Sequence, residues 1–512
     1  MAHLGSGRRR LLAVPVGLAL TASLGFLPGM SASAATLDGP AATAANTVGP
    51  KLSYVVNLSR TGPGTAKQVT KAIEAAGGTV VTAYEQIGVV VVHSQNPDFA
   101  KQIRLAKGVS SAGATRTAPL SVVQTTEEGS TEVLTDAQAA KAAAEAGPGQ
   151  EPLEPNQWDL RKIKADEAHK INIGSPNVTV GVIDTGVDDT HPDLAPNFSK
   201  EQSANCVGGV ADQTDGAWRP YADGSDHGTH VAGTIAAARN GIGVSGIAPG
   251  VKVAGIKVSE PGTSLFYAEA VVCGFVFAAE HGIEVTNNSY YMDPWYFNCK
   301  DDEDQKALVD AVGRATAYAE KKGTLSVASA GNSDWDLASD SIVDNTSPDD
   351  ATPADRTIDP HKCLDIPTQL PGVVSVSATG DQGLRSYYSS FGLGVIDVAA
   401  PGGDKWQIPD TPDQNGRVLS TLPGGGYGYK QGTSMAGPHV AAVAALIKSK
   451  HPNLRPAQVQ ALLKAEADQT DCPEQIYDAA GALRDASNCE SYGPQTGYYG
   501  WGVVNALKAV KW

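Results

Sequence analysis

The sequence lacks the long apolar runs and the basic surface that would place the mature chain in a membrane or on a nucleic acid. After Ala34, no apolar stretch approaches the roughly 18 residues of a membrane-spanning helix, and no lipid-attachment signal is present. Basic residues are in deficit, with 39 Lys and Arg against 55 Asp and Glu and a formal net charge of −16. Since proteins that follow phosphates concentrate Lys and Arg, we expect no nucleic-acid partner.

The first 34 residues have the layout of a secretory signal peptide. Three arginines at positions 8–10 precede an apolar run that ends near Leu27, and Ala32-Ser33-Ala34 fits a signal-peptidase site. A membrane anchor is the alternative, but Pro15, Gly17 and Thr21 dilute the run. We therefore expect a secreted, extracellular product that has no membrane association after cleavage.

Cysteine is absent before Cys206, and the six cysteines that follow predict up to three disulfides in an exported chain. Fifteen connectivities are possible. Cys472 and Cys489 bracket a short polar segment and form the favoured local pair, and nearest-neighbour pairing adds Cys206–Cys273 and Cys299–Cys363. Zinc is the alternative, but the sequence contains no Cys-x-x-Cys spacing.

The 512 residues suffice for one large domain and a smaller one. In the segment 35–122, the pattern predicts a small α+β, ferredoxin-like unit of order βαββαβ. Its expected strands are 52–56, 80–81, 88–92 and 109–112, and its expected helices are 65–76 and 96–106. The segment 123–155 is biased toward Ala, Gly and Pro and is interpreted as an exposed linker where proteolytic processing would fall.

From residue 156 to residue 512, short apolar strands alternate with amphipathic helices, which predicts a three-layer α/β domain with a mainly parallel central sheet. Ligands in such folds bind beyond the carboxyl ends of the strands. No internal repeat of fixed period is present.

Three motifs carry residues suited to nucleophilic catalysis. Asp184 ends the buried run Val180-Gly181-Val182-Ile183, where a carboxylate would be desolvated and aimed, although a turn-capping role is the alternative. His227 opens an apolar helix in Asp-His-Gly-Thr-His-Val-Ala-Gly-Thr, at a helix mouth where a general base can face a cleft. His230 three residues later does not give the His-Glu-x-x-His zinc pattern, so we interpret it as a buried structural histidine.

The third motif is Gly-Thr-Ser-Met-Ala-Gly-Pro-His-Val around Ser434. Glycines flank a serine at a helix start, Pro438 fits the first helical turn, and the helix dipole favours negative charge beside Ser434. The alternative is a structural role, in which Ser434 only caps the N-terminus of the helix.

In this order, the three motifs resemble those of subtilisin-like serine proteases, over about residues 158–512. The resemblance implies that Ser434 is the nucleophile, that His227 is the general base and that Asp184 orients the imidazole, as in the well-studied triad of that family. It also implies that Asn332, in Ala-Ser-Ala-Gly-Asn after a buried strand, donates to the oxyanion together with the Ser434 backbone N–H.

The same resemblance extends to partners. It implies protein or peptide substrates bound as an added strand along Thr286-Asn287-Asn288-Ser289. Ser289, Tyr290 and Tyr291 are then substrate-binding residues, and the two tyrosines stand near a position where the family often has glycine. Strand alternation predicts that only one of them faces the substrate pocket. The unit 35–122 resembles the family's inhibitory propeptide, which implies a self-processing zymogen.

No cofactor is required for this chemistry, but the resemblance implies a structural calcium ion with side-chain oxygens from Asp193 and Asn240. Two rivals remain: a catalytically silent binding protein on the same scaffold, and an enzyme with a glutamate base. The intact triad and Asn332 disfavour the first, and His227 in its motif disfavours the second.

Overall fold

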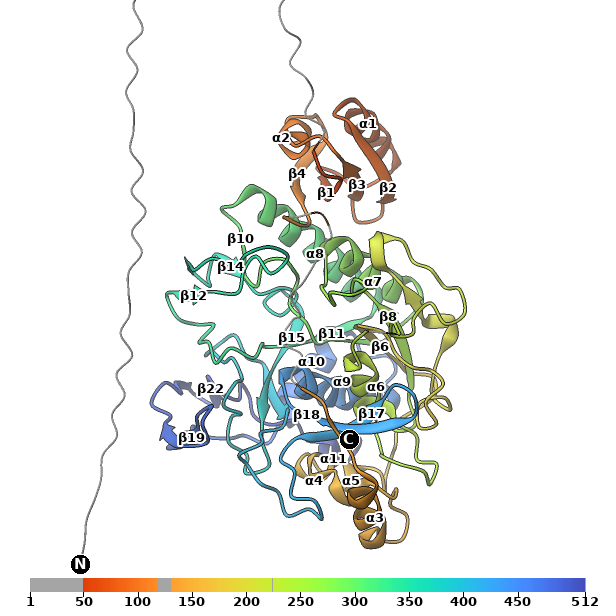
Figure 1. Cartoon of the computed structure of the whole chain (residues 1–512), viewed down its shortest axis with the longest axis vertical. Coiled ribbons are helices and arrows are strands. Elements are labelled where there is room, and N and C mark those ends of the chain that lie inside the picture. Colours follow the sequence, from red (N-terminus) through yellow and green to blue (C-terminus); the bar gives the residue numbers. More distant parts are fainter. Residues whose placement is uncertain (1–48, 118, 120–129, 223, 512) are drawn as a thin grey trace, which may run out of the picture. The chain divides into compact units, whose positions relative to one another are not determined.

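The computed structural model describes residues 49–117, 119, 130–222 and 224–511 (Figure 1). The expected signal peptide and the first part of the expected linker lie outside the described residues. Among the residues that are described, no helix is long and apolar enough to cross a membrane.

Residues 52–114 form a four-stranded antiparallel sheet of order β2-β3-β1-β4 with two helices. The elements are β1 (Leu52–Leu58), α1 (Pro63–Ala75), β2 (Gly78–Tyr84), β3 (Val89–Ser94), α2 (Phe99–Arg104) and β4 (Val109–Ala114). One core holds them together, because Val56, Val69, Val92 and Phe99 are all fully buried in it. We call residues 49–117 the N-terminal module.

The segment expected as an exposed linker is folded in its second half, which corrects that interpretation for residues 130–155. β5 (Glu132–Val133) pairs with β18 (Gly426–Lys430), and α3 (Asp136–Glu145) follows it. Thr135 and Gln138 form a capping box at the start of α3, and alanine has the highest helix propensity. The alanine-rich composition therefore marks a helix, and Ala142 is buried against Leu153.

The large domain is built on a seven-stranded sheet of order β16-β15-β11-β9-β6-β8-β7 in which every adjacent pair of strands is parallel. Its strands are β6 (Thr179–Asp184), β7 (Ala204–Asn205), β8 (Lys252–Lys257), β9 (Val285–Asn288), β11 (Leu325–Ser329), β15 (Val373–Thr379) and β16 (Val398–Pro401). The expected parallel α/β sheet is therefore confirmed. A neighbouring hairpin consists of β17 (Val418–Leu422) and β18.

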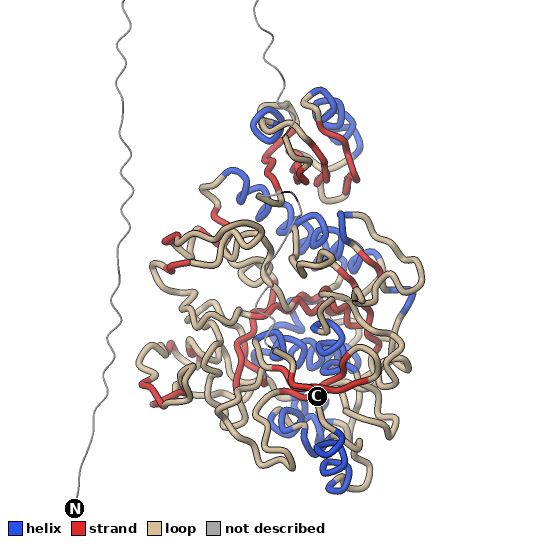
Figure 2. The backbone as a smooth tube through the Cα atoms, viewed as in Figure 1, coloured by secondary structure: helices blue, strands red, loops and turns tan. Residues whose placement is uncertain are grey.

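Helices cover both faces of this sheet (Figures 1 and 2). One face packs on α6 (His227–Ala236) and α9 (Thr433–Lys450), and the other on α7 (Ala268–Glu280) and α8 (Glu303–Lys322). Alternate residues of β6 serve the two layers: Val180 and Val182 face α6 and α9, whereas Ile183 faces α7 and α8. The carboxyl ends of β6, β9 and β11 thus lie at one edge, between the starts of α6 and α9.

The remaining helices and strands lie in connections and at the chain end. They are α4 (Trp158–Lys162), α5 (Ala165–Ala168), α10 (Pro456–Glu466), α11 (Ala506–Lys511), β10 (Asn298–Cys299), β12 (Ile342–Asp344), β13 (Arg356–Ile358), β14 (Cys363–Leu364), β19 (Gln475–Tyr477), β20 (Leu483–Asp485), β21 (Ser491–Tyr492) and β22 (Gln495–Thr496), with 3-10 turns at Glu154–Asn156, Lys200–Gln202 and Val207–Gly209.

All six cysteines are paired, as Cys206–Cys273, Cys299–Cys363 and Cys472–Cys489. The three expected pairings are confirmed, and the zinc alternative is wrong. The one group of three candidate metal-binding side chains found within the described ranges is Cys299, Asp301 and Cys363, and its two sulfurs are bonded to each other.

Candidate active site

Asp184 is the last residue of β6 and is fully buried. Its Oδ1 lies 2.8 Å from His227 Nδ1 and also accepts the Thr185 backbone N–H at 2.7 Å. Thr185 Oγ1 in turn accepts the Gly228 N–H at 3.0 Å, which fastens the end of the strand to the start of α6. The turn after the buried strand therefore aims the carboxylate at the imidazole.

His227 is the first residue of α6 and is 4% exposed. A Cβ at Gly228 would overlap the Gly186 carbonyl, so only glycine lets the helix start so close to the strand end. Because an ionised carboxylate only accepts, the contact with Asp184 places the imidazole proton on Nδ1 and leaves Nε2 as the basic nitrogen. His230 is fully buried, and burial lowers its pKa to about 3, as expected for a structural histidine.

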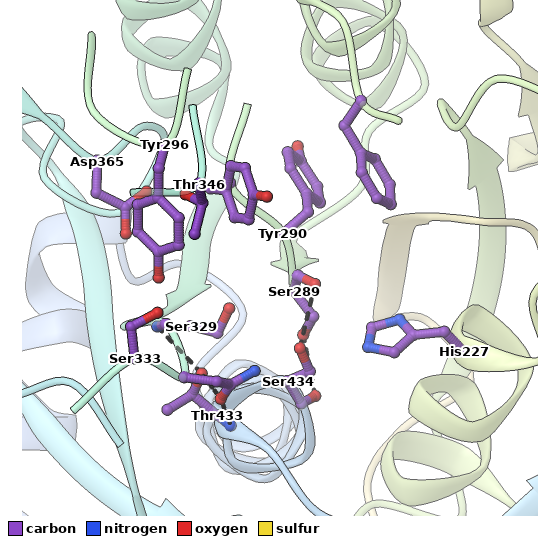
Figure 3. Close-up of a pocket in the computed structure, with 14 residues that line it drawn as sticks. His227, Ser289, Tyr290, Tyr296, Ser329, Ser333, Thr346, Asp365, Thr433 and Ser434 are labelled. Carbon is purple, nitrogen blue, oxygen red and sulfur yellow. Dashed lines mark hydrogen bonds between the residues drawn. The ribbon is translucent and has the colours of Figure 1, made fainter. Parts of the chain in front are cut away.

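Ser434 is the second residue of α9, and its Oγ donates to the Ser289 carbonyl at 3.3 Å. Figure 3 shows the His227 ring directed toward this serine from the opposite wall. Catalytic hydrogen bonds are often long or poorly aligned before substrate binds.

Pro438 lies one turn inside α9 rather than in its first turn, which corrects the sequence-based placement. A residue at that position would normally donate its N–H to the Ser434 carbonyl, four residues earlier, and proline has no N–H. The Ser434 carbonyl instead accepts the Ser289 hydroxyl at 3.0 Å. The proline thus frees a carbonyl that ties α9 to the segment after β9.

Asn332 follows β11 and presents its amide beside the start of α9. Its Oδ1 accepts the backbone N–H and the hydroxyl of Thr433 at 2.8 and 2.9 Å, which assigns the other end of the amide as the donor Nδ2. A Cβ built on Gly432 would lie 3.5 Å from Asn332 Nδ2 and 3.6 Å from the Ser434 backbone nitrogen. The two nitrogens therefore lie near each other beside Gly432.

One cavity brings His227, Ser289, Tyr290, Tyr291, Asn332 and Ser434 together (Figure 3). Asp184 stands behind His227 and does not line it. Sequence reasoning missed the other lining residues, which are Phe266, Tyr296, Ser329, Gly331, Ser333, Thr346, Asp365 and Thr433. Gly331, Ser333 and Thr433 could have been found as neighbours of predicted residues, whereas Phe266, Thr346 and Asp365 are joined to the cavity only by the fold.

Both tyrosines line the cavity, although alternation along a strand predicts that only one of them faces it. The reason is that β9 ends at Asn288, before either tyrosine. Tyr290 stacks on Phe266 with ring centroids 4.6 Å apart, and Tyr291 stacks on Tyr296 at 4.2 Å. Their rings wall the cavity on one side.

Asp365 is a carboxylic acid in the same cavity and is 1% exposed. Burial raises its pKa well above the usual value near 3.8. Its Oδ1 is buried and has no hydrogen-bond partner within the described residues. Figure 3 shows it beside Tyr296, at the end of the cavity away from His227.

The two residues expected to bind calcium are held by protein donors. Asp193 Oδ2 accepts the Val244 N–H and the Tyr427 hydroxyl, both at 3.0 Å. Asn240 donates to the Pro192 carbonyl at 3.1 Å and accepts the Ile242 N–H at 3.1 Å. Calcium takes six to eight oxygen ligands. Asp193 Oδ1 is buried and has no hydrogen-bond partner within the described residues, so it is free to serve as one of them, and the calcium site stays a prediction.

Comparisons with known proteins agree on one family. The model of the subtilase family, peptidase S8, matches residues 175–502. Subtilisin NAT of Bacillus subtilis subsp. natto is 34% identical over 310 residues, which are 60% of this chain and 65% of that protein. Subtilisin of Bacillus pumilus is 34% identical over 310 residues and 90% of its length. The matched part of the chain thus spans 65% of the full length of subtilisin NAT.

Solved structures agree on the fold. The epidermin leader peptide processing serine protease of Staphylococcus aureus superposes with a TM-score of 0.63 at 24% identity, over 90% of this chain and 98% of that one. Fervidolysin of Fervidobacterium pennivorans gives a TM-score of 0.59 at 24% identity, over 91% and 62%. Since the family model covers more than half of the chain and the sheet and helices follow the same fold, the chain belongs to the subtilase family of serine peptidases.

Proposed function

We propose that this chain is a secreted serine endopeptidase, made as a zymogen, that hydrolyses peptide bonds of proteins through an acyl-enzyme. The observation that carries the proposal is the Asp184–His227 hydrogen bond behind a cavity that also holds Ser434 and Asn332. No cofactor takes part in this chemistry.

Each residue has a role that follows from its atoms. Ser434 Oγ attacks the substrate carbonyl while His227 Nε2 takes its proton, and Asp184 stabilises the imidazolium that results. The carbonyl oxygen becomes an oxyanion, which Asn332 Nδ2 and the Ser434 N–H stabilise as hydrogen-bond donors. His227 then protonates the leaving amine. In the second half of the reaction, His227 takes a proton from a water molecule that attacks the ester, and returns it to Ser434 Oγ as the acid product leaves.

The N-terminal module is proposed as the intramolecular inhibitor. It contacts α8 through matched polar groups: Asn57 Nδ2 donates to the Ala307 carbonyl at 2.8 Å, and Arg104 pairs with Glu303 at 2.7 Å. Arg314 of α8 donates to the carbonyls of Leu58 and Gly88 at 2.9 and 2.8 Å. These contacts support a docked state of the module before processing.

A fluorophosphonate probe tests the proposed activity. We expect the purified protein to be labelled at Ser434, read by mass spectrometry, and to cleave an unfolded protein substrate. Ser434→Ala should remove both signals, and Ser333→Ala, a serine in the same cavity, should keep them. A protein that binds peptides but is never labelled would be a catalytically silent member of the family.

A further inference from the structure

Arg116, at the end of the N-terminal module, is buried in the large domain and is 8% exposed. Its Nη2 lies 3.0 Å from Glu260 Oε1 and 2.7 Å from Glu269 Oε1. The centre of its guanidinium stands 4.0 Å from the ring centroid of Tyr267. We call Glu260, Tyr267 and Glu269 the acidic pocket.

The acidic pocket is built for a cation. Glu260 is 7% exposed and Glu269 is 1% exposed, and two buried carboxylates that face each other repel unless a positive charge lies between them. Burial raises the pKa of Glu260, Arg116 lowers it and Glu269 raises it. Glu269 Oε2 is buried and has no hydrogen-bond partner in the described part of the chain, so the pocket holds an acceptor that Arg116 leaves unused.

The acidic pocket offers a cationic side chain two kinds of contact. Its carboxylate oxygens pair with N–H donors, and the face of the Tyr267 ring attracts a positive charge. A single nitrogen of Arg116, Nη2, reaches both carboxylates, so these contacts suit the ammonium group of a lysine as well as a guanidinium.

The acidic pocket is connected through the chain to the cavity that contains Ser434. Tyr267 directly follows Phe266, which lines that cavity and stacks on Tyr290. The residue after Arg116, Thr117, donates its N–H to Asp350 Oδ2 at 2.8 Å, and Asp350 also lies 3.5 Å from the Tyr267 hydroxyl. The end of the module is thus held beside Tyr267, with Arg116 in the acidic pocket and Thr117 on Asp350.

We propose that the acidic pocket is a substrate subsite that selects an arginine or lysine side chain, and that Arg116 occupies it as a substrate mimic. The substrate class rests on the proposed peptidase function, whereas the recognition of a cation does not. The competing interpretation is a mere anchor that fits Arg116 alone.

Chemical rescue tests recognition without catalysis. In the full chain carrying Ser434→Ala and Arg116→Ala, the pocket loses its cation, and we expect faster amide hydrogen exchange over residues 258–268. N-ethylguanidinium should restore protection and N-ethylurea, its neutral analogue, should not. Adding Glu269→Gln should abolish the rescue, and adding Glu280→Gln, at the exposed end of the same helix, should keep it. Equal rescue by both compounds, or rescue by neither, overturns the proposal.

Cleavage of peptide pairs tests the substrate class. Peptides that carry arginine or its neutral isostere citrulline at each position before the scissile bond should show a preference of at least about tenfold in kcat/KM for arginine at one position, or about 1.4 kcal/mol. Glu269→Gln should reduce this ratio toward one, and Glu280→Gln should retain it. If all pairs are cleaved equally, the subsite proposal fails while the peptidase stands; if ethylguanidinium rescues protection but nothing is cleaved or labelled, the peptidase fails and the cation pocket stands.

A second carboxyl supports an independent proposal. Asp365 lines the same cavity as Ser434, and Figure 3 places it at the far end from His227. One oxygen of its carboxyl is buried and lacks a hydrogen-bond partner in the residues described. We infer that Asp365 pairs with a basic side chain of the substrate at a position different from that read by the acidic pocket.

The same peptide pairs test Asp365. Asp365→Asn should remove an arginine preference at one position and leave the preference that depends on Glu269 at another. The control is Asp340→Asn, at an exposed site. If Asp365→Asn retains every arginine preference of the parent, Asp365 is a structural carboxyl.

Discussion

At the scale of single residues, the position of the nucleophile depends on what Pro438 lacks. Its missing N–H leaves the Ser434 carbonyl to accept the Ser289 hydroxyl, while the Ser289 carbonyl accepts the Ser434 hydroxyl. Two reciprocal hydrogen bonds therefore connect α9 to the segment after β9, and the same segment continues into the tyrosines of the cleft. The pair Ser289 and Ser434 thus positions both the nucleophile and the segment whose tyrosines line the cavity.

Asn332→Ala should lower kcat about 10²- to 10³-fold with little change in KM, because the side-chain amide stabilises an oxyanion that exists only after attack. Steady-state kinetics on a fluorogenic peptide give both constants. Ser333→Ala, the next residue in the same cavity, is the matched control and should change kcat far less. A rise in KM alone would mark Asn332 as a ground-state contact.

Asp365→Asn should stabilise the protein at neutral pH, since an amide does not ionise, whereas burial disfavours the ionised form of the carboxyl. Burial raises the folded-state pKa, so above pH 3.8 the unfolded chain releases a proton that the folded chain retains. Stability contributed by the protonated carboxyl is therefore lost as pH rises toward the folded pKa. Denaturation midpoints at pH 5 and pH 8 should show a larger gain for Asp365→Asn at pH 8; equal gains would mean that Asp365 does not titrate.

At the scale of elements, the N-terminal module meets the large domain where β4 lies against α8. A Cβ on Gly113 of β4 would lie 2.7 Å from Asp304 Cα, so glycine at this position permits backbone-to-backbone contact. Asp304 also pairs with Arg104 of the module. Close packing and charge therefore coincide at the N-terminal turn of α8.

Gly113→Ala should weaken docking of the module, because the added methyl group forces β4 and α8 apart. An overpacking penalty of about 1–3 kcal/mol corresponds to roughly 5- to 150-fold weaker association. We expect active enzyme to appear sooner after purification of the unprocessed chain, followed with a fluorogenic peptide. Gly64→Ala is the control, since a Cβ there meets no atom within 4 Å. Identical time courses for the two variants would contradict the docking role.

Element boundaries show where sequence reasoning succeeds and where it stops. The starts of α6 and α9 could be predicted because glycines, polar residues and apolar runs mark them locally. The end of β9 at Asn288 could not, because Tyr290 and Tyr291 leave the strand to stack on Phe266 and Tyr296, which are distant in sequence. The contact of Arg116 with Glu269 is of the same kind, because no local pattern relates residues 153 positions apart.

At the scale of the whole molecule, the parallel sheet joins strands that are far apart in the sequence. β6 pairs with β8 and β9, and β11 pairs with β15. Each pairing closes a long loop, and the entropy cost of that closure comes before the stabilising contacts between the strands form. The N-terminal module has a compact core of its own and contacts both α7 and α8. A module that binds these helices early can therefore assist the slow assembly of the sheet.

Secreted Ser434→Ala protein should accumulate with its module attached when it is expressed in a host that lacks other proteases. The parent chain should instead be cut between the module and the large domain. Because β5 is paired with β18, cleavage beyond residue 131 would require that strand to separate, so we expect the bond to lie before Glu132. Intact-mass spectrometry and N-terminal sequencing identify the cut and, at the other end, removal of residues 1–34.

Asp340→Asn, which is exposed and outside the cleft, should mature as the parent does. Normal maturation of Ser434→Ala would show that a separate enzyme processes the chain, and the proposed self-cleavage would then be wrong even if Ser434 proved to be the nucleophile.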